Sequence, residues 1–246
     1  MVNNMSKKVA VIIGVGPLNG LGAQLCKRFA RSGYHVFAAG RTLEKIQLVT
    51  EKIRAEGGEA TGLVADATSP EAMIDLFEKA NEIGTVSLSI FNAGNGMVGD
   101  FLEMEPDFFE TCWRISCFGG FLFSQQAIKA MLPQGIGTLL YTSASAALRG
   151  KPYAAAFTAA KAGVRALSQS LCREFGPLGI HVSNVVIDGP IDGDRIRKLR
   201  PYMLEARGED GLISIQGIVD IYEMLHNQPK KAWSHEIDVR TFKEEW

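Results

Sequence analysis

Three glycines after the first apolar run have the spacing of a phosphate-binding loop. Gly16, Gly20 and Gly22 form the pattern Gly-x-x-x-Gly-x-Gly, between a β-branched run and an amphipathic segment. Glycines at such a junction permit a tight turn and let backbone N–H groups and a helix N-terminus approach a pyrophosphate. We therefore expect Gly16, Gly20, Leu21 and Gly22 to bind a dinucleotide. The alternative is a purely structural turn.

One basic side chain follows the second apolar run, where an NAD-binding protein has an acidic residue for the ribose hydroxyls. The sequence there is Ala38-Ala39-Gly40-Arg41 and contains no acid. The guanidinium of Arg41 is a permanently charged fork that suits a 2′-phosphate. We therefore predict NADP(H) as the cofactor, with NAD(H) less favoured. The alternative for Arg41 is local pairing beside Glu44.

A lysine in an alanine-rich segment is the third chemical feature. The segment reads Tyr153-Ala-Ala-Ala-Phe157-Thr-Ala-Ala-Lys161. A spacing of four residues places Lys161 and Phe157 on one helical face, with Tyr153 one turn earlier. An ammonium group can protonate an alkoxide directly or through water. The alternative for Lys161 is an exposed lysine on a helix surface.

The elements that must position these residues alternate along the chain. We expect strands at 9–13, 35–39, 60–65, 86–91, 137–142, 180–187 and 236–239, and helices at 20–31, 43–55, 106–132 and 153–175 with another opening at Ser69. This alternation implies right-handed βαβ units and an α/β fold. The expected fold is a doubly wound parallel sheet of about seven strands, Rossmann-type and three-layered. Residues 1–246 are expected to form a single dinucleotide-binding domain, with its ligand at the carboxyl ends of the strands.

Over about residues 7 to 190, the sequence resembles the short-chain dehydrogenase/reductase family. The family's loop is Thr-Gly-x-x-x-Gly-x-Gly, and Val15 stands where its Thr would be. Asn92-Ala93-Gly94 resembles the family's Asn-Asn-Ala-Gly element, with Phe91 replacing the first Asn. The resemblance implies further cofactor contacts from Asp66, Ala67, Asn92, Ala93, Gly94, Lys161, Gly189 and Ile191. In the family pattern, Asp66 holds the adenine amino group and Lys161 holds the nicotinamide ribose, while Asn92 also suits a structural turn.

The catalytic part of the family pattern is altered. In the family a Tyr protonates the alkoxide, a Lys four residues later lowers the pKa of that Tyr, a Ser orients the carbonyl and an Asn completes a proton relay. Lys161 matches the Lys, but Phe157, Ala144 and Ser116 stand at the other three positions. A phenyl ring has no proton to donate. The sequence therefore predicts a short-chain enzyme that lacks the usual catalytic Tyr.

Two residues offer replacement hydroxyls beside Lys161. Thr142 shares the strand parity of Ala144, whereas regular alternation directs Ser143 and Ser145 away from it. Tyr153 offers a phenol, although its distance from Lys161 argues against it and an ordinary surface or core role is the alternative. The catalytic candidates are therefore Lys161, Thr142 and Tyr153.

The segment after the sixth predicted strand lacks clear periodicity. It carries five basic side chains, at Arg195, Arg197, Lys198, Arg200 and Arg207. Such a charge run is usually a solvated face. The alternative is a flap over the pocket, since long structureless loops in compact domains tend to be functional. We expect residues 189–213 to be a substrate flap.

Composition excludes several classes of protein. Lys and Arg number 26 against 27 Asp and Glu, a formal charge of −1, so no nucleic-acid partner is expected. No run approaches 18 apolar residues, so no membrane partner is expected, and the protein is interpreted as cytoplasmic. The four cysteines form no Cys-x-x-Cys pair and only four histidines are present, so no metal site is expected. By family resemblance, the aromatic helix 106–132 and the Lys161 helix favour a homodimer or homotetramer.

The leading hypothesis is an NADP(H)-dependent oxidoreductase. It would transfer a hydride between nicotinamide and a small carbonyl or alcohol, with an atypical proton donor. A rival hypothesis is an NADP(H)-binding pseudoenzyme, sensor or regulatory protein on the same fold, motivated by the altered catalytic positions. A third is a lyase or isomerase that uses the same pocket.

Overall fold

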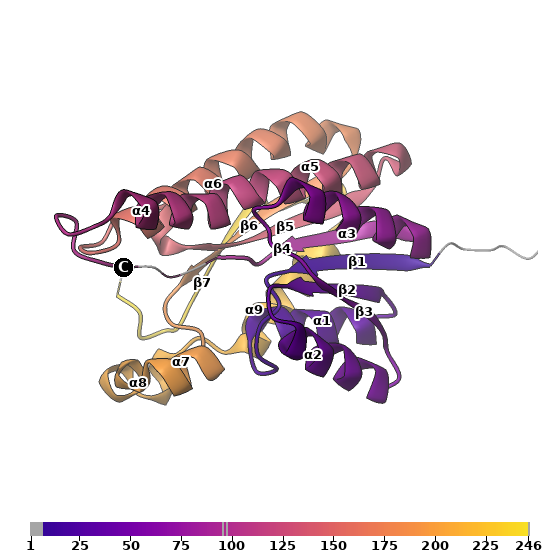
Figure 1. Cartoon of the computed structure of the whole chain (residues 1–246). Coiled ribbons are helices and arrows are strands. Elements are labelled where there is room, and N and C mark those ends of the chain that lie inside the picture. Colours follow the sequence, from indigo (N-terminus) through magenta and orange to yellow (C-terminus); the bar gives the residue numbers. More distant parts are fainter. Residues whose placement is uncertain (1–6, 95, 97, 246) are drawn as a thin grey trace, which may run out of the picture.

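A parallel sheet runs through the middle of the molecule. The computed structural model describes residues 7–94, 96 and 98–245. Within these residues, seven strands form one sheet in the order β3-β2-β1-β4-β5-β6-β7 (Figure 1). The strands are β1 Lys8–Ile13, β2 His35–Gly40, β3 Glu59–Val64, β4 Thr85–Phe91, β5 Gly137–Ala144, β6 Ile180–Asp188 and β7 Glu236–Arg240. The doubly wound fold is confirmed, and its strand order reverses between β1 and β4.

Helices cover both faces of the sheet. They are α1 Leu21–Arg31, α2 Leu43–Ala55, α3 Pro70–Ile83, α4 Pro106–Trp113, α5 Gly119–Met131, α6 Ala155–Phe175, α7 Asp194–Leu199, α8 Pro201–Arg207 and α9 Ile215–His226. In Figure 1, α1, α2 and α9 lie below the sheet, and α3, α5 and α6 lie above it. The short helices α7 and α8 stand apart from both layers, beyond the ends of the strands.

Burial on both faces explains the uninterrupted apolar runs of the strands. Along β1, Ala10 and Ile12 belong to the core cluster between the sheet and the helices α1, α2 and α9. Val9, Val11 and Ile13 belong to the cluster on the opposite face. Because both sides of the strand are covered, alternation of polar and apolar residues disappears. The central strands therefore read as β-branched segments rather than as an alternating pattern.

Three predicted elements differ from the observed ones. The predicted helix 106–132 contains a π-helical turn, Arg114–Phe118, between α4 and α5. The helix predicted from Tyr153 begins at Ala155, because Tyr153 has a φ of 63°, in the left-handed region. The segment interpreted as lacking periodicity contains α7 and α8. Each is only six or seven residues long, too short to show a helical repeat.

Candidate active site

The glycine loop packs the end of β1 tightly against its neighbours. Gly14 has a φ of 90°, and a Cβ there would lie 2.5 Å from the backbone nitrogen of Ala93. A Cβ on Gly22 would lie 2.6 Å from the carbonyl oxygen of Gly14. Gly16 differs, because a Cβ there would have no atom within 4 Å. The loop is thus close-packed on its protein side and open at Gly16, as a backbone cradle for a phosphate must be.

Asn92 joins the ends of three strands. Its backbone N–H donates to Ile13 O at 3.0 Å, and its Nδ2 donates to Gly14 O at 3.0 Å. Its Oδ1 accepts a hydrogen bond of 2.8 Å from Thr142 Oγ1. The Thr142 hydroxyl also lies 2.6 Å from the hydroxyl of Tyr222 on α9. These contacts hold the ends of β1, β4 and β5 together and occupy the Thr142 hydroxyl, which the sequence suggests as a catalytic candidate.

Lys161 is a buried cation. Its side chain leaves α6 toward the end of β5, is 5% exposed, and donates from Nζ to Thr142 O at 2.8 Å. Burial lowers the pKa of Lys161 to about 8, because the charged form loses its hydration. The Phe157 ring lies one turn earlier, with its centroid 5.9 Å from Nζ. The structure therefore places an ammonium, without a phenol at position 157, on this face of α6.

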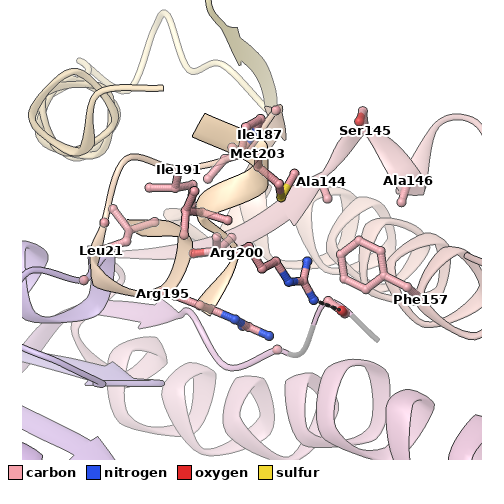
Figure 2. A pocket seen from close by; sticks show the side chains of 18 of the residues that line it. Leu21, Ala144, Ser145, Ala146, Phe157, Ile187, Ile191, Arg195, Arg200 and Met203 are labelled. Atoms are coloured by element: carbon pink, nitrogen blue, oxygen red, sulfur yellow. Dashed lines mark hydrogen bonds between the residues drawn. The ribbon is translucent and has the colours of Figure 1, made fainter. Parts of the chain in front are cut away.

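A cavity of about 590 Å³ connects the glycine loop to Lys161. Figure 2 shows Leu21 and Ile191 on one side of it and Ala144 and Phe157 on the other. Of the residues predicted from sequence, the cavity is lined by Gly16, Gly20, Leu21, Gly22, Asn92, Gly94, Thr142, Lys161, Gly189 and Ile191. Arg41, Asp66, Ala67, Ala93 and Tyr153 are not part of this lining.

Arg41 and Asp66 follow β2 and β3, which are neighbours in the sheet. Arg41 is exposed and makes no ion pair with Glu44 or with another described residue. The Asp66 carboxylate accepts hydrogen bonds from Thr68 N and Thr68 Oγ1, both at 2.8 Å. Because the carboxyl ends of parallel strands share one edge of the sheet, both side chains extend the same edge as the glycine loop.

Tyr153 lies outside the pocket. Its side chain is 65% exposed, and it precedes α6 rather than forming its first turn. The structure therefore does not bring this phenol to Lys161.

The residues around Ala144 do not follow strand parity. β5 ends at Ala144 and Ser145 begins a 3-10 turn, so the expected alternation stops there. Ser143, Ala144 and Ser145 all contribute to the cavity lining, and the Ser145 hydroxyl forms a hydrogen bond with Asp188. Ser143 is buried, and its hydroxyl has no hydrogen-bond partner among the described residues. Ser143 is thus a site residue that parity reasoning set aside.

Asp188 forms a buried ionic contact beneath the pocket. Its carboxylate is fully buried and lies 3.0 Å from Arg149 Nη2. Burial opposes ionisation, but a hydrogen bond from Ser145 and the charge of Arg149 together hold the pKa of Asp188 below its ordinary value. The contacts of Asp188 with Ser145 and Arg149 hold the 3-10 turn after β5 in place.

The π-helical turn places Ser116 beside the lysine. Ser116 is fully buried, and its hydroxyl has no partner among the described residues. A Cβ added to Gly94 would lie 3.0 Å from Lys161 Nζ and 3.9 Å from Ser116 Oγ, so the three residues meet at one point. Single π-helical turns are frequent at functional sites.

The C-terminal segment contacts residues 189–213, the predicted flap. Lys243 Nζ lies 3.1 Å from Asp210 Oδ2, and Glu244 forms an ion pair with Arg207. A Cβ on Gly189 would lie 3.3 Å from Glu244 Oε2. Residues on both sides of α9 therefore meet at the mouth of the cavity.

The comparisons with known proteins agree with this geometry. A family model described as short chain dehydrogenase matches residues 8–202, so the chain belongs to the short-chain dehydrogenase/reductase family, an oxidoreductase family. It is 30% identical over 198 residues to sorbitol-6-phosphate 2-dehydrogenase of Escherichia coli (strain K12), covering 79% of this chain and 76% of that protein.

Two solved structures share the fold over nearly the whole chain. A short-chain dehydrogenase from Rhodopseudomonas palustris matches with a TM-score of 0.82 and 31% identity, covering 96% of this chain and 99% of that one. A variant of actinorhodin polyketide ketoreductase with NADPH matches with a TM-score of 0.87 and 22% identity, covering 96% of each chain. The predicted family and Rossmann-type fold are both confirmed.

Two further findings concern the described residues alone. Among them, no three His, Cys, Asp or Glu side chains gather in a way that would hold a metal ion. None of the helices they form has both the length and the apolar character needed to cross a bilayer.

Proposed function

We propose that this chain is an NADP(H)-dependent oxidoreductase that transfers a hydride between nicotinamide and a small carbonyl or alcohol, with Lys161 as the proton donor. The observation that carries the proposal is the buried ammonium of Lys161, which lines the same cavity as the glycine loop. Burying a cation is costly, and strongly shifted pKa values cluster at functional sites.

The residues present fit the cofactor. Gly16 leaves open space where a phosphate would approach the backbone, and Gly20, Leu21 and Gly22 continue that surface into α1. Arg41 would take the 2′-phosphate and Asp66 the adenine amino group, at the neighbouring strand ends. When bound, NADPH supplies the hydride. The polyketide ketoreductase of similar fold is known in a structure with NADPH, which supports the same cofactor here.

Lys161 would hold and transfer the proton. One N–H of its ammonium is fixed on Thr142 O, which orients the group at the end of β5. As the carbonyl carbon gains the hydride, the carbonyl oxygen would take a proton from Nζ, leaving a neutral amine that water reprotonates. With a pKa of about 8, this exchange is accessible near neutral pH.

The test is NADPH oxidation across a panel of small aldehydes and ketones by wild type and Lys161→Met. We expect the variant to lose at least about 100-fold in kcat, since a general acid contributes roughly 10²- to 10⁴-fold. Wild-type reduction should decrease as pH rises through about 8, because only the ammonium donates a proton. NADPH binding without hydride transfer to any member of the panel would disprove the proposal.

The preference for NADPH over NADH is tested by measuring the dissociation constants of both cofactors. We expect tighter NADPH binding, and a selective loss of that binding in Arg41→Ala, because an arginine–phosphate contact is charge-assisted. Lys45→Ala, an exposed cation on the adjoining helix α2, is the matched control. A tighter NADH value would contradict the assignment.

The second candidate function is a cofactor-binding sensor or regulatory protein without turnover. It is favoured by Phe157 and Ala144, which line the cavity where the family pattern has Tyr and Ser. The double variant Phe157→Tyr with Ala144→Ser separates the candidates. Reductase activity that appears only in the double variant indicates a site that has lost turnover. Native activity that falls in it indicates chemistry specific to the present residues.

A further inference from the structure

Two arginines of the flap extend into the pocket. Arg195 lies on α7 and Arg200 lies at the junction of α7 and α8. Figure 2 shows both side chains inside the cavity, between Leu21 and Phe157. Arg200 Nη2 donates to Gly96 O at 3.1 Å, across the pocket from the flap to the segment after β4. Two guanidinium groups from one flap therefore enter the same space.

Among the described residues, the acidic side chains that line this cavity are Asp194 and Glu244, and each forms an ion pair. Asp194 lies 3.0 Å from Lys198, and its pKa is lowered chiefly by that hydrogen bond. Glu244 forms an ion pair with Arg207, and the Glu244 side chain is only 6% exposed. Each of these carboxylates thus has a cationic partner of its own. The charge that the pocket presents to a ligand comes mainly from its lysines and arginines.

Arg195 and Arg200 are close enough to influence each other. Burial by the cavity walls and, second to it, the positive charge of Arg200 lower the pKa of Arg195. Repulsion between like charges in a cavity is relieved when an anion binds between them. Paired N–H donors on planar guanidinium groups also match the geometry of carboxylate and phosphate oxygens.

The position of Arg200 assigns the anion to the reacting end of the pocket. Gly96 follows Gly94 by two residues, and a Cβ on Gly94 would lie only 3.0 Å from Lys161 Nζ. The open backbone at Gly16, by contrast, belongs to the glycine loop, where the cofactor's pyrophosphate is expected. An anion bound by Arg200 would therefore belong to the molecule that meets Lys161.

We propose that Arg195 and Arg200 bind an anionic group of the substrate, a carboxylate or a phosphate. This inference rests on the proposed function, because it takes the cavity to be a substrate site beside a bound cofactor. It narrows the substrate from any small carbonyl or alcohol to one that carries negative charge. It also gives the flap a role in selecting the substrate as well as covering it.

The experiment measures binding without turnover, so it remains informative if hydride transfer fails. Protein saturated with NADPH is titrated with inorganic phosphate and, separately, with acetate, at constant ionic strength, by isothermal titration calorimetry. The variants are Arg195→Met and Arg200→Met, which keep an unbranched side chain of similar reach. Arg197→Met is the matched control, because Arg197 is on the same flap, is 42% exposed and pairs with Asp192 and Glu209, neither of which lines the cavity.

We expect saturable binding of at least one anion to wild type, weakened roughly tenfold or more by each arginine substitution. The control should stay within about twofold of wild type, as an exposed ion pair contributes little. NADPH affinity, measured separately without added anion, should stay near the wild-type value in all three variants.

Three outcomes would overturn the inference. A parallel loss of NADPH affinity in the arginine variants would assign both residues to the cofactor's phosphates. An equal loss of anion binding in Arg197→Met would indicate a general charge effect of the flap. The absence of saturable binding of either anion to wild type would show that no anion site exists in the cofactor-bound protein.

Discussion

Lys161 shows what a buried cation contributes to the site and what it costs the fold. It makes no ion pair within the described part of the chain, and one hydrogen bond to a carbonyl oxygen replaces its hydration. The same desolvation that destabilises the charge brings its pKa toward the working range of a proton donor. Reactivity and stability are therefore opposed at this one residue.

The stability of the cofactor-free protein should reveal this opposition. A pKa lowered from 10.5 to about 8 corresponds to about 3 kcal/mol. Lys161→Met should therefore be more stable than wild type at pH 7, by about 2 kcal/mol once roughly 1 kcal/mol for the lost hydrogen bond is subtracted. Urea unfolding gives the comparison.

The sign of the pH dependence follows from proton binding. Between pH 8 and 10.5 the unfolded chain holds the lysine proton and the native protein does not, so wild-type stability gains with rising pH. The advantage of Lys161→Met should shrink across this window. Lys79→Met, which removes an exposed pair with Asp75, is the control and should change little at either end. A Lys161→Met variant less stable than wild type at pH 7 would contradict the argument.

At the scale of elements, α5 begins where another segment of backbone approaches it closely. Gly119 is its first residue, and a Cβ there would lie 3.1 Å from both the Cβ and the carbonyl oxygen of Ala67. Ala67 follows β3, at the end of the sheet where the adenine is expected. The start of this helix therefore supports the segment that carries Asp66 and Ala67.

Gly119→Ala should destabilise the protein by roughly 1 kcal/mol or more, since overpacking against backbone forces the elements apart. Gly217→Ala on α9 is the matched control, because its added Cβ would meet only Ser214 Cβ at 3.8 Å. That control should be stabilised by about 0.5–1 kcal/mol, the usual gain from replacing a helical glycine. Thermal unfolding of both variants decides the matter, and a stabilised Gly119→Ala would refute the packing argument.

The inner strands were predictable because burial on both faces selects long apolar runs, whereas the edge strands β3 and β7 are partly exposed. The predicted run at 9–13 and the observed β1 differ by one residue.

The π-helical turn could not be predicted in this way, because one extra residue in a turn does not change the apolar pattern of an already aromatic segment. Similarly, the spacing that located Lys161 did not show that Tyr153 has a left-handed backbone. The positions of side-chain hydroxyl groups, such as those of Ser143 and Thr142, depend on tertiary contacts, which a local sequence pattern does not predict. The helix α9 was not predicted at all, although Ser214 caps it.

At the scale of the whole molecule, Trp113 and Phe121 form an exposed aromatic surface, with the half-buried Phe118 between them. Their rings stack in sequence, with centroids 6.1 Å and 6.3 Å apart. Phe123, two residues further, is fully buried in the core. The aromatic segment thus serves two purposes, with one side packed inward and the other directed outward. Exposed aromatic clusters of this kind are typical of protein interfaces.

We expect this surface to form the contact of a homodimer, as family resemblance implies. Phe121 is 44% exposed, and Phe121→Glu should shift the protein to a monomer, because a carboxylate buried at a contact loses its hydration. Phe242→Glu, at a phenylalanine that is 85% exposed elsewhere, should leave the oligomer unchanged. Analytical ultracentrifugation measures both. A wild-type protein that sediments as a monomer would disprove this expectation.

The contact between Glu244 and Arg207 has a consequence for what holds the flap in place. Glu244 follows the last strand, β7, whereas Arg207 belongs to the flap, so their ion pair joins the flap to the sheet through the C-terminal segment. Lys243 adds a second ion pair to the same flap, with Asp210. The position of the flap therefore depends on two segments of the chain that α9 separates in the sequence.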